Sequence, residues 1–136
     1  MNSKLALAVI LICAAVMTIF AQQKRPYDAI MKDVNATFAS LKKNLDSNSL
    51  SSAAEDAAKL ESLFHETETF WSAFKTKDAI DSSKSAQSSS QAVAAAAKEG
   101  NGQKAQASYG SIGKFCKGCH DNHREQMPDK SFKIKP

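Results

Sequence analysis

The fold class is decided by residues 27–45, whose sequence is YDAIMKDVNATFASLKKNL. Large apolar side chains recur there at steps of three and four residues, which is the spacing of one face of an α-helix. This apolar face consists of Tyr27, Ile30, Met31, Val34, Phe38, Leu41 and Leu45. Pro26 comes just before the stretch and suits the first turn of a helix. The pattern therefore predicts a helix that buries one face against other helices.

A second helix is predicted to begin near Ser52, where Ser52 and Glu55 form the pattern of a capping box. This helix directs three large apolar residues inward: Leu60, Leu63 and Phe64. An aromatic cluster lies on its last turns or just beyond them and consists of Phe70, Trp71 and Phe74.

A third helix is predicted between Asp78, which can cap its start, and Gly100, the residue type expected just past a helix C-terminus. Its body is rich in Ala and Ser, a composition that also suits a disordered linker. We predict a helix because Ala is the best helix former and the body has neither Pro nor Gly. A fourth helix is predicted from about residue 102 to residue 127, where Pro128 stops it. The tail, residues 129–136, is predicted to be a solvated extension.

No segment alternates like a β-strand, so we predict an all-α fold. Four helices with short connections make an antiparallel four-helix bundle, which forms one domain over residues 22–136. The third helix is poor in large apolar side chains, and a buried cofactor would supply the missing core volume. Gly110, Gly113 and Gly118 in the fourth helix each cost about 1 kcal/mol relative to Ala. That cost suggests that a large group lies against this backbone.

Residues 1–21 have the pattern of a secretory signal peptide, which predicts a periplasmic protein. Lys4 supplies the positive charge, residues 5–19 are apolar, and Ala21 lies at the expected cleavage point. An uncleaved N-terminal anchor is the alternative, although the run is short for a membrane span. The mature chain loses Cys13 and Lys4, which leaves 17 basic and 14 acidic residues, a net charge of +3. Such a mild charge does not suggest a nucleic-acid-binding protein.

Residues 116–120 read Cys-Lys-Gly-Cys-His, the C-x-x-C-H pattern of covalent haem attachment. Two thioether bonds must reach two vinyl groups on one edge of the ring, and cysteines three residues apart lie on the same side of a helical turn. His120 follows Cys119 directly, so its imidazole can reach the iron. We therefore predict one haem c, attached through Cys116 and Cys119, with His120 as the proximal ligand.

Other readings of the two cysteines are weaker. A redox C-x-x-C centre normally accompanies a βαβ pattern, which is absent from the sequence. A zinc site formed by Cys116, Cys119, His123 and His65 lacks a second pair of ligands at close spacing. A disulfide would close a very small loop and stabilise the fold little.

The sixth iron ligand, if there is one, must come from upstream, because only 16 residues follow His120. Met31 lies on the inner face of the first helix and is the best candidate, although core packing explains a methionine there equally well. Met127 would lie on the same side of the haem as His120. His65 reads as a surface histidine beside carboxylates. His123 is expected to flank the proximal side.

A four-helix bundle with C-x-x-C-H on its last helix resembles the class II c-type cytochromes, the cytochrome c prime group and its low-spin relatives. The resemblance is most specific over residues 116–124, CKGCHDNHR. It implies that Arg124 lies near the proximal histidine or a haem propionate. It also places Met31 at the position where the electron-transfer branch has its methionine ligand, whereas the gas-binding branch has an apolar residue there. Tyr27 stands where the family often has Arg, and a homodimer would be common for the family.

We therefore expect an exported monohaem electron carrier that is not an enzyme, and a five-coordinate protein that binds nitric oxide or carbon monoxide is the alternative. A thioether ligand would raise the reduction potential. Four residues are candidates to wall the haem pocket: Phe38, Leu63, Phe64 and Trp71. Five lysines could form a positive rim that steers an acidic redox partner, unless they are only a solvated tail: Lys114, Lys117, Lys130, Lys133 and Lys135.

Overall fold

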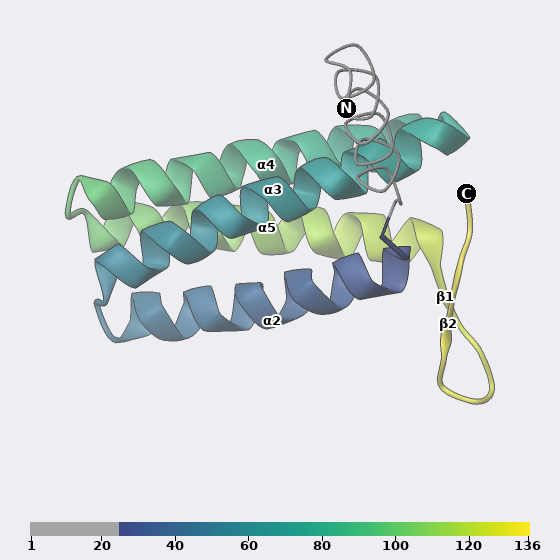
Figure 1. Cartoon of the computed structure of the whole chain (residues 1–136), viewed down its shortest axis with the longest axis horizontal. Helices are drawn as coiled ribbons and strands as arrows, with labels where there is room; N and C mark the ends of the chain where they lie inside the picture. Colours follow the sequence, from purple (N-terminus) through teal and green to yellow (C-terminus); the bar gives the residue numbers. More distant parts are fainter. Residues whose placement is uncertain (1–24) are drawn as a thin grey trace, which may run out of the picture.

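The computed structural model describes residues 25–136, which form four long helices and a short C-terminal hairpin. The helices are α2 (Tyr27–Asp46), α3 (Leu50–Phe74), α4 (Lys77–Lys98) and α5 (Gly102–His123), and the strands are β1 (Arg124–Gln126) and β2 (Phe132–Ile134). Consecutive helices run antiparallel, which confirms the predicted four-helix bundle (Figure 1). The predicted signal segment, Lys4 and Cys13 included, lies outside the described residues. None of the helices within residues 25–136 combines the length and apolar character that a bilayer crossing demands.

The first two helices begin with backbone rather than side-chain caps. The Pro26 carbonyl accepts hydrogen bonds from the amides of Ala29 and Ile30 at 3.1 and 3.2 Å, and α2 starts one residue later. Helix α3 begins at Leu50, two residues before the predicted start, and no side chain caps it. The capping box predicted for Ser52 and Glu55 is therefore wrong, because both residues lie inside a helix that has already begun.

Helix α4 is continuous over the segment rich in Ala and Ser, which confirms the prediction of a helix there. Thr76 precedes it, so Asp78 lies in its first turn rather than at the cap. Gly100 follows its C-terminal end with a φ of 75°, the left-handed conformation that favours glycine.

Small side chains on α4 allow the tightest packing of the bundle. Its buried residues are Ala79, Ser83, Ala86, Ser90, Val93, Ala96 and Ala97. The hydroxyl groups of Ser83 and Ser90 each donate to the carbonyl four residues earlier, at 2.8 Å, so neither buried oxygen is left unpaired. Helices α3 and α5 both pack closely on this helix, whereas α2 packs on α3 and contacts α5 sparsely.

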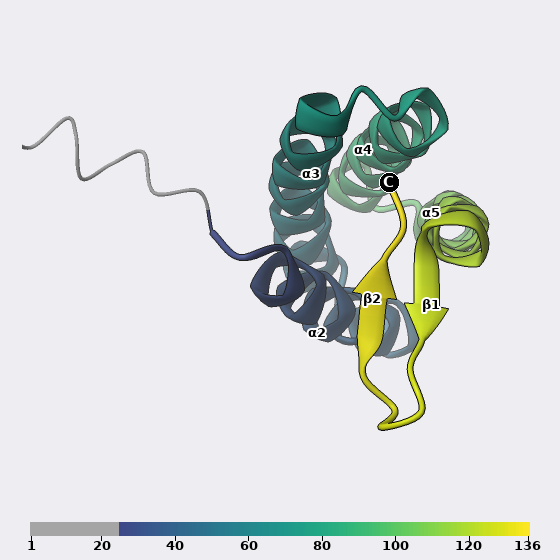
Figure 2. The same ribbon diagram turned by 90° about the vertical axis from the view of Figure 1, so that its right-hand side faces the viewer.

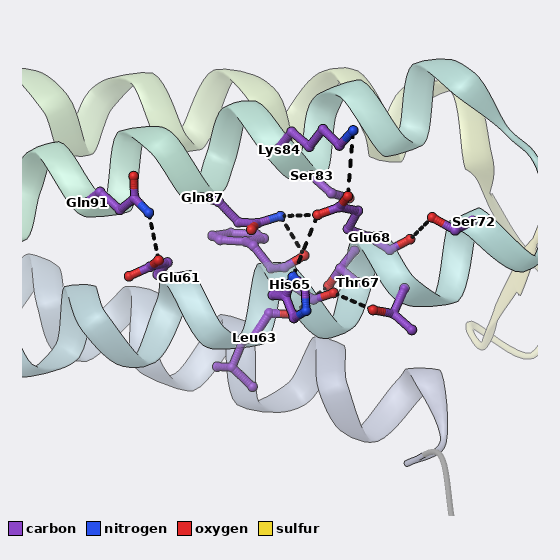
Figure 3. Close-up of polar contacts among 12 residues, drawn as sticks. Glu61, Leu63, His65, Thr67, Glu68, Ser72, Ser83, Lys84, Gln87 and Gln91 are labelled. Atoms are coloured by element: carbon purple, nitrogen blue, oxygen red, sulfur yellow. Dashed lines mark hydrogen bonds and ion pairs between the residues drawn. The ribbon is translucent and has the colours of Figure 1, made fainter. Parts of the chain in front are cut away.

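Polar side chains tie α3 to α4 outside the core (Figure 3). The amide of Gln87 donates to the Glu68 carboxylate at 2.8 Å, and that of Gln91 donates to Glu61 at 2.7 Å. His65 belongs to this surface, with its Nδ1 atom 3.7 Å from Glu68 and its side chain 71% exposed. His65 is therefore the surface histidine beside carboxylates that the sequence predicts.

The C-terminal segment differs from the prediction, because α5 ends at His123 and not at residue 127. The residues that follow form an antiparallel hairpin in which Arg124 pairs with Ile134 and Gln126 with Phe132. The turn is closed locally, as the amide of Ser131 donates to the Asp129 carboxylate at 3.0 Å. The predictions that no strand forms and that residues 129–136 are a plain extension are therefore wrong, whereas most of these residues are exposed to solvent, as predicted. Strands of three residues are too short to show an alternating pattern in the sequence.

Replacing Leu60, which is fully buried, tests the packing of the core. We expect Leu60→Ala to lower the free energy of unfolding by about 2–5 kcal/mol, because it leaves a cavity among the helices. Urea denaturation followed by circular dichroism measures the change. The exposed neighbour Lys59 supplies the control, and Lys59→Ala should change stability by less than about 0.5 kcal/mol. Equal effects of the two substitutions would contradict the described core.

Candidate cofactor site

A cavity of about 720 Å³ lies between α2 and α5, within the range of cofactor and small-molecule sites. The sparse contact between these two helices leaves room for it. All five residues predicted to bind a cofactor or its metal line this cavity: Met31, Cys116, Cys119, His120 and Arg124. The structure thus brings together residues from the first and last helices, which are about 90 positions apart in the sequence.

Helix α5 contributes three of these residues from its last two turns, and all three are half-buried. Burial raises the pKa of the Cys116 thiol to about 11, and the nearby Cys119 adds to the shift. Burial also raises the pKa of Cys119. Burial lowers the pKa of His120, and the positive charge of Arg124 lowers it further. The cavity wall therefore presents two neutral thiols and a neutral imidazole.

The opposite wall comes from α2 and α3. Met31 is half-buried, lines the cavity and also packs against the apolar core. Phe38 lines the cavity and stacks on Tyr109, with ring centroids 4.3 Å apart. Because the cavity is apolar over most of its wall, it suits a large apolar ring better than a charged molecule.

Of the four residues predicted to wall the pocket, three do so. Phe38, Phe64 and Trp71 line the cavity, whereas Leu63 is buried in the core and is not part of the cavity wall. Phe64 and Trp71 lie seven residues apart and share one face of α3, whereas Leu63 is turned about 100° away from Phe64. The prediction for Leu63 is therefore wrong, since periodicity alone did not separate the core face of α3 from its cavity face.

Tyr27 and Trp71 join α2 to α3 at the edge of the cavity. The indole Nε1–H of Trp71 donates to the Tyr27 hydroxyl at 2.9 Å, and the tyrosine ring stacks on Phe70 at 4.1 Å. Burial raises the pKa of Tyr27 to about 12, so the phenol stays neutral. The sequence placed Tyr27 on the inner face of its helix but gave no signal of this hydrogen bond.

His123 lines the same cavity, and both its ring nitrogens face protein oxygens. Its Nε2 atom is 2.8 Å from the Asp78 carboxylate, and its Nδ1 atom is 2.8 Å from the Lys135 carbonyl. The bond to His123 is the main reason why the pKa of Asp78 is lowered. His123 therefore flanks the site, as predicted, but has no nitrogen left to bind iron.

The zinc site considered from the sequence is not assembled. His65 lies on the exposed surface of α3 and does not line the cavity. Within residues 25–136, no three side chains of His, Cys, Asp or Glu gather as a metal site. Among the described residues, Cys116, Cys119 and His120 therefore have no further side chain beside them that would complete a zinc site.

Only one of the three glycines singled out in α5 faces the cavity. Gly113 lines it, and a Cβ atom there would lie 3.7 Å from Phe38. Gly110 and Gly118 have open space around them. Of the three glycines, Gly113 is thus the one on the cavity wall, and the prediction that a large group lies against this backbone stays a prediction.

The C-terminal hairpin forms a wall of the cavity that the sequence analysis missed. It lies at the end of the bundle, between α2 and α5 (Figure 2). Phe132 and Ile134 line the cavity, as does Arg124, whose guanidinium lies 4.2 Å from the centre of the Phe132 ring. Among the five lysines of the predicted rim, Lys133 also lines the cavity, and Lys117 forms an ion pair with Asp121.

The structure is similar to that of a cytochrome c′ from Rubrivivax gelatinosus, with a TM-score of 0.53 and 21% sequence identity. The similarity covers 70% of this chain and 88% of that chain. No protein-family model and no curated protein sequence matches this chain. At this level of identity the similarity shows that the two proteins share a fold.

Replacing Tyr27 with Phe tests the hydrogen bond that joins α2 to α3 beside the cavity. We expect Tyr27→Phe to lower the free energy of unfolding by about 1–3 kcal/mol, because the buried indole N–H of Trp71 loses its acceptor. Urea denaturation measures this loss, and the NMR shift of the single indole N–H reports the bond itself. Tyr109→Phe is the matched control, because no described residue accepts or donates a hydrogen bond at the Tyr109 hydroxyl. An unchanged indole shift in Tyr27→Phe would contradict the contact.

Proposed function

We propose that this chain is a class II c-type cytochrome, an exported electron carrier with one haem attached through Cys116 and Cys119. One observation carries the proposal: the cavity between α2 and α5 gathers the C-x-x-C-H residues and Met31 on its walls. The fold shared with a cytochrome c′ supports the same proposal. Export to the periplasm rests on the signal-peptide pattern of residues 1–21.

The residues present fit a haem. The cavity has the volume and the apolar walls that such a ring needs, and the two thiols stand one helical turn apart on one side of it. Each thiol would add its S–H across one vinyl group, so that a thioether forms and nothing leaves. When bound, the haem iron supplies a one-electron redox centre.

His120 and Met31 are the proposed iron ligands. The lowered pKa of His120 keeps its imidazole neutral, which leaves a nitrogen lone pair for a metal. Met31 comes from α2, on the other side of the cavity, and would offer its sulfur. A thioether ligand stabilises reduced iron and raises the potential. Because outer-sphere electron transfer makes and breaks no substrate bond, the proposal assigns no catalytic residue and no enzymatic activity.

Arg124 is proposed to face a haem propionate. It lines the cavity as the first residue of β1, four positions after His120. Its guanidinium lies over the face of the Phe132 ring. In this position its N–H groups stay free to bind a carboxylate.

A second function follows from the packing of Met31. Its side chain belongs to the group of residues packed against the apolar core, as expected for a methionine that only fills space. In that case the iron has an open site, and the protein binds nitric oxide or carbon monoxide instead of carrying electrons.

Absorption spectra of the purified holoprotein separate the two functions. We expect a low-spin spectrum that carbon monoxide barely changes, and a high-spin, gas-sensitive spectrum in Met31→Ala. Met127→Ala is the matched control and should behave as wild type, because Met127 is exposed in the hairpin turn. Haem should stay on the denatured chain and be lost when Cys116 and Cys119 are both changed to Ala. A gas-sensitive wild type would favour the gas-binding function, and a chain without bound haem would overturn both.

A positive rim is proposed to steer an acidic redox partner. Lys133 lines the cavity, and Lys130 and Lys135 lie in the same exposed segment, so this segment places positive charge at one side of the site. Electrostatic steering can raise association rates at least about tenfold and weakens as salt rises. We expect the electron-transfer rate with such a partner to fall with ionic strength, and Lys133→Glu to slow it. Lys98→Glu, at the far end of α4, is the control. A rate that does not depend on salt would refute steering.

A further inference from the structure

Most of the paired hairpin residues that line the cavity share one face of the ribbon, although Lys133, on the other face, also lines it. Arg124 is paired with Ile134, and Gln126 with Phe132, so these four side chains lie on the same face of the ribbon. Three of them, Arg124, Phe132 and Ile134, line the cavity. The hairpin sits at the end of the bundle, where Figure 2 shows it between α2 and α5.

Few apolar contacts hold the hairpin in this position. Among residues 124–136, Ile134 is half-buried and every other residue is exposed, including Phe132 at 54%. Segments with little buried apolar surface open at a low free-energy cost. The hairpin can therefore separate from the cavity without unfolding the bundle.

His123 fastens the hairpin to two helices. Its backbone carbonyl accepts from the Lys135 amide at 2.9 Å, and its Nδ1 atom lies 2.8 Å from the Lys135 carbonyl. Its Nε2 atom lies 2.8 Å from Asp78 on α4. One residue at the end of α5 thus joins the far end of β2 to the first turn of α4.

We propose that the hairpin is a cover, fastened by His123, that selects by size which molecules reach the cavity. Small molecules enter past the closed hairpin, whereas bulky ones need it to open at its bonds to His123. The proposal adds an access element to the site of the proposed function, and its test does not require bound haem.

The two cavity thiols report access directly. The experiment uses the full chain produced without haem and carrying Cys13→Ser, so that Cys116 and Cys119 are the only thiols. The rate of alkylation is measured with iodoacetamide, a small reagent, and with fluorescein maleimide, a bulky one. We expect His123→Ala to speed the bulky reagent up to about tenfold, because the contact of Nδ1 with the Lys135 carbonyl is lost, and to leave the small reagent nearly unchanged.

Asp78→Ala removes one bond of the fastening from an exposed position and should act in the same direction. Asp81→Ala is its matched control, since Asp81 pairs with Lys77 on the same helix.

Phe132→Ala should also admit the bulky reagent, whereas Phe74→Ala, similarly exposed but not part of the cavity wall, should not. Fluorescence of Trp71, the single tryptophan, verifies that each variant is folded.

Two results would overturn the proposal. Equal rates of the bulky reagent in wild type, His123→Ala and Asp78→Ala would show that the hairpin does not limit access. An equal acceleration of both reagents would show that access does not depend on size. Because the thiols react without haem, a chain that failed to bind haem would overturn the proposed function and leave this result standing.

Discussion

The packing of small side chains along α4 is the constraint on which the rest of the structure depends. Alanine and serine face inward over most of this helix, so α3 and α5 can both approach it closely. Helix α2 packs on α3 and therefore stays apart from α5. The cavity of about 720 Å³ occupies the space left by the separation of α2 from α5. A larger side chain at Ser83 or Ala86, which both line the cavity, would fill the space that the site needs.

Burial in that volume shifts the pKa values of the residues on its walls so that their uncharged forms are favoured. It keeps the thiols of Cys116 and Cys119 protonated, the imidazole of His120 uncharged and the phenol of Tyr27 neutral. An apolar interior disfavours every charged form, so one physical cause acts in the same sense on four different groups. The fixed charge of Arg124 stays at the exposed rim, where solvation costs little. The cavity thus offers uncharged donors inside and a cation at its edge, which suits a large ring with carboxylates on one side.

His123 shows how one residue can serve two neighbouring parts of a structure. In the sequence it stands three positions after His120 and could be taken for a metal ligand. In the structure its two ring nitrogens lie 2.8 Å from oxygens of Asp78 and Lys135, so it connects the end of the hairpin to α4. The ring also lies 5.0 Å from that of Trp71, which connects the hairpin to the aromatic residues beside the cavity. The end of α5 is therefore built by contacts that join three separate parts of the chain.

The sequence by itself determined the four helices, the left-handed Gly100 and the spacing of Cys116, Cys119 and His120, because each signal is contained within a few turns of one helix. It also indicated that Met31 and the cysteines would share one site. Only the tertiary structure decided that Phe64 and not Leu63 faces the cavity, and that a hairpin closes the end of the bundle. These features depend on contacts such as that of His123 with Asp78, which are 45 residues apart. Helical periodicity and short motifs cannot predict a contact of that kind, because it forms only once the helices have packed together.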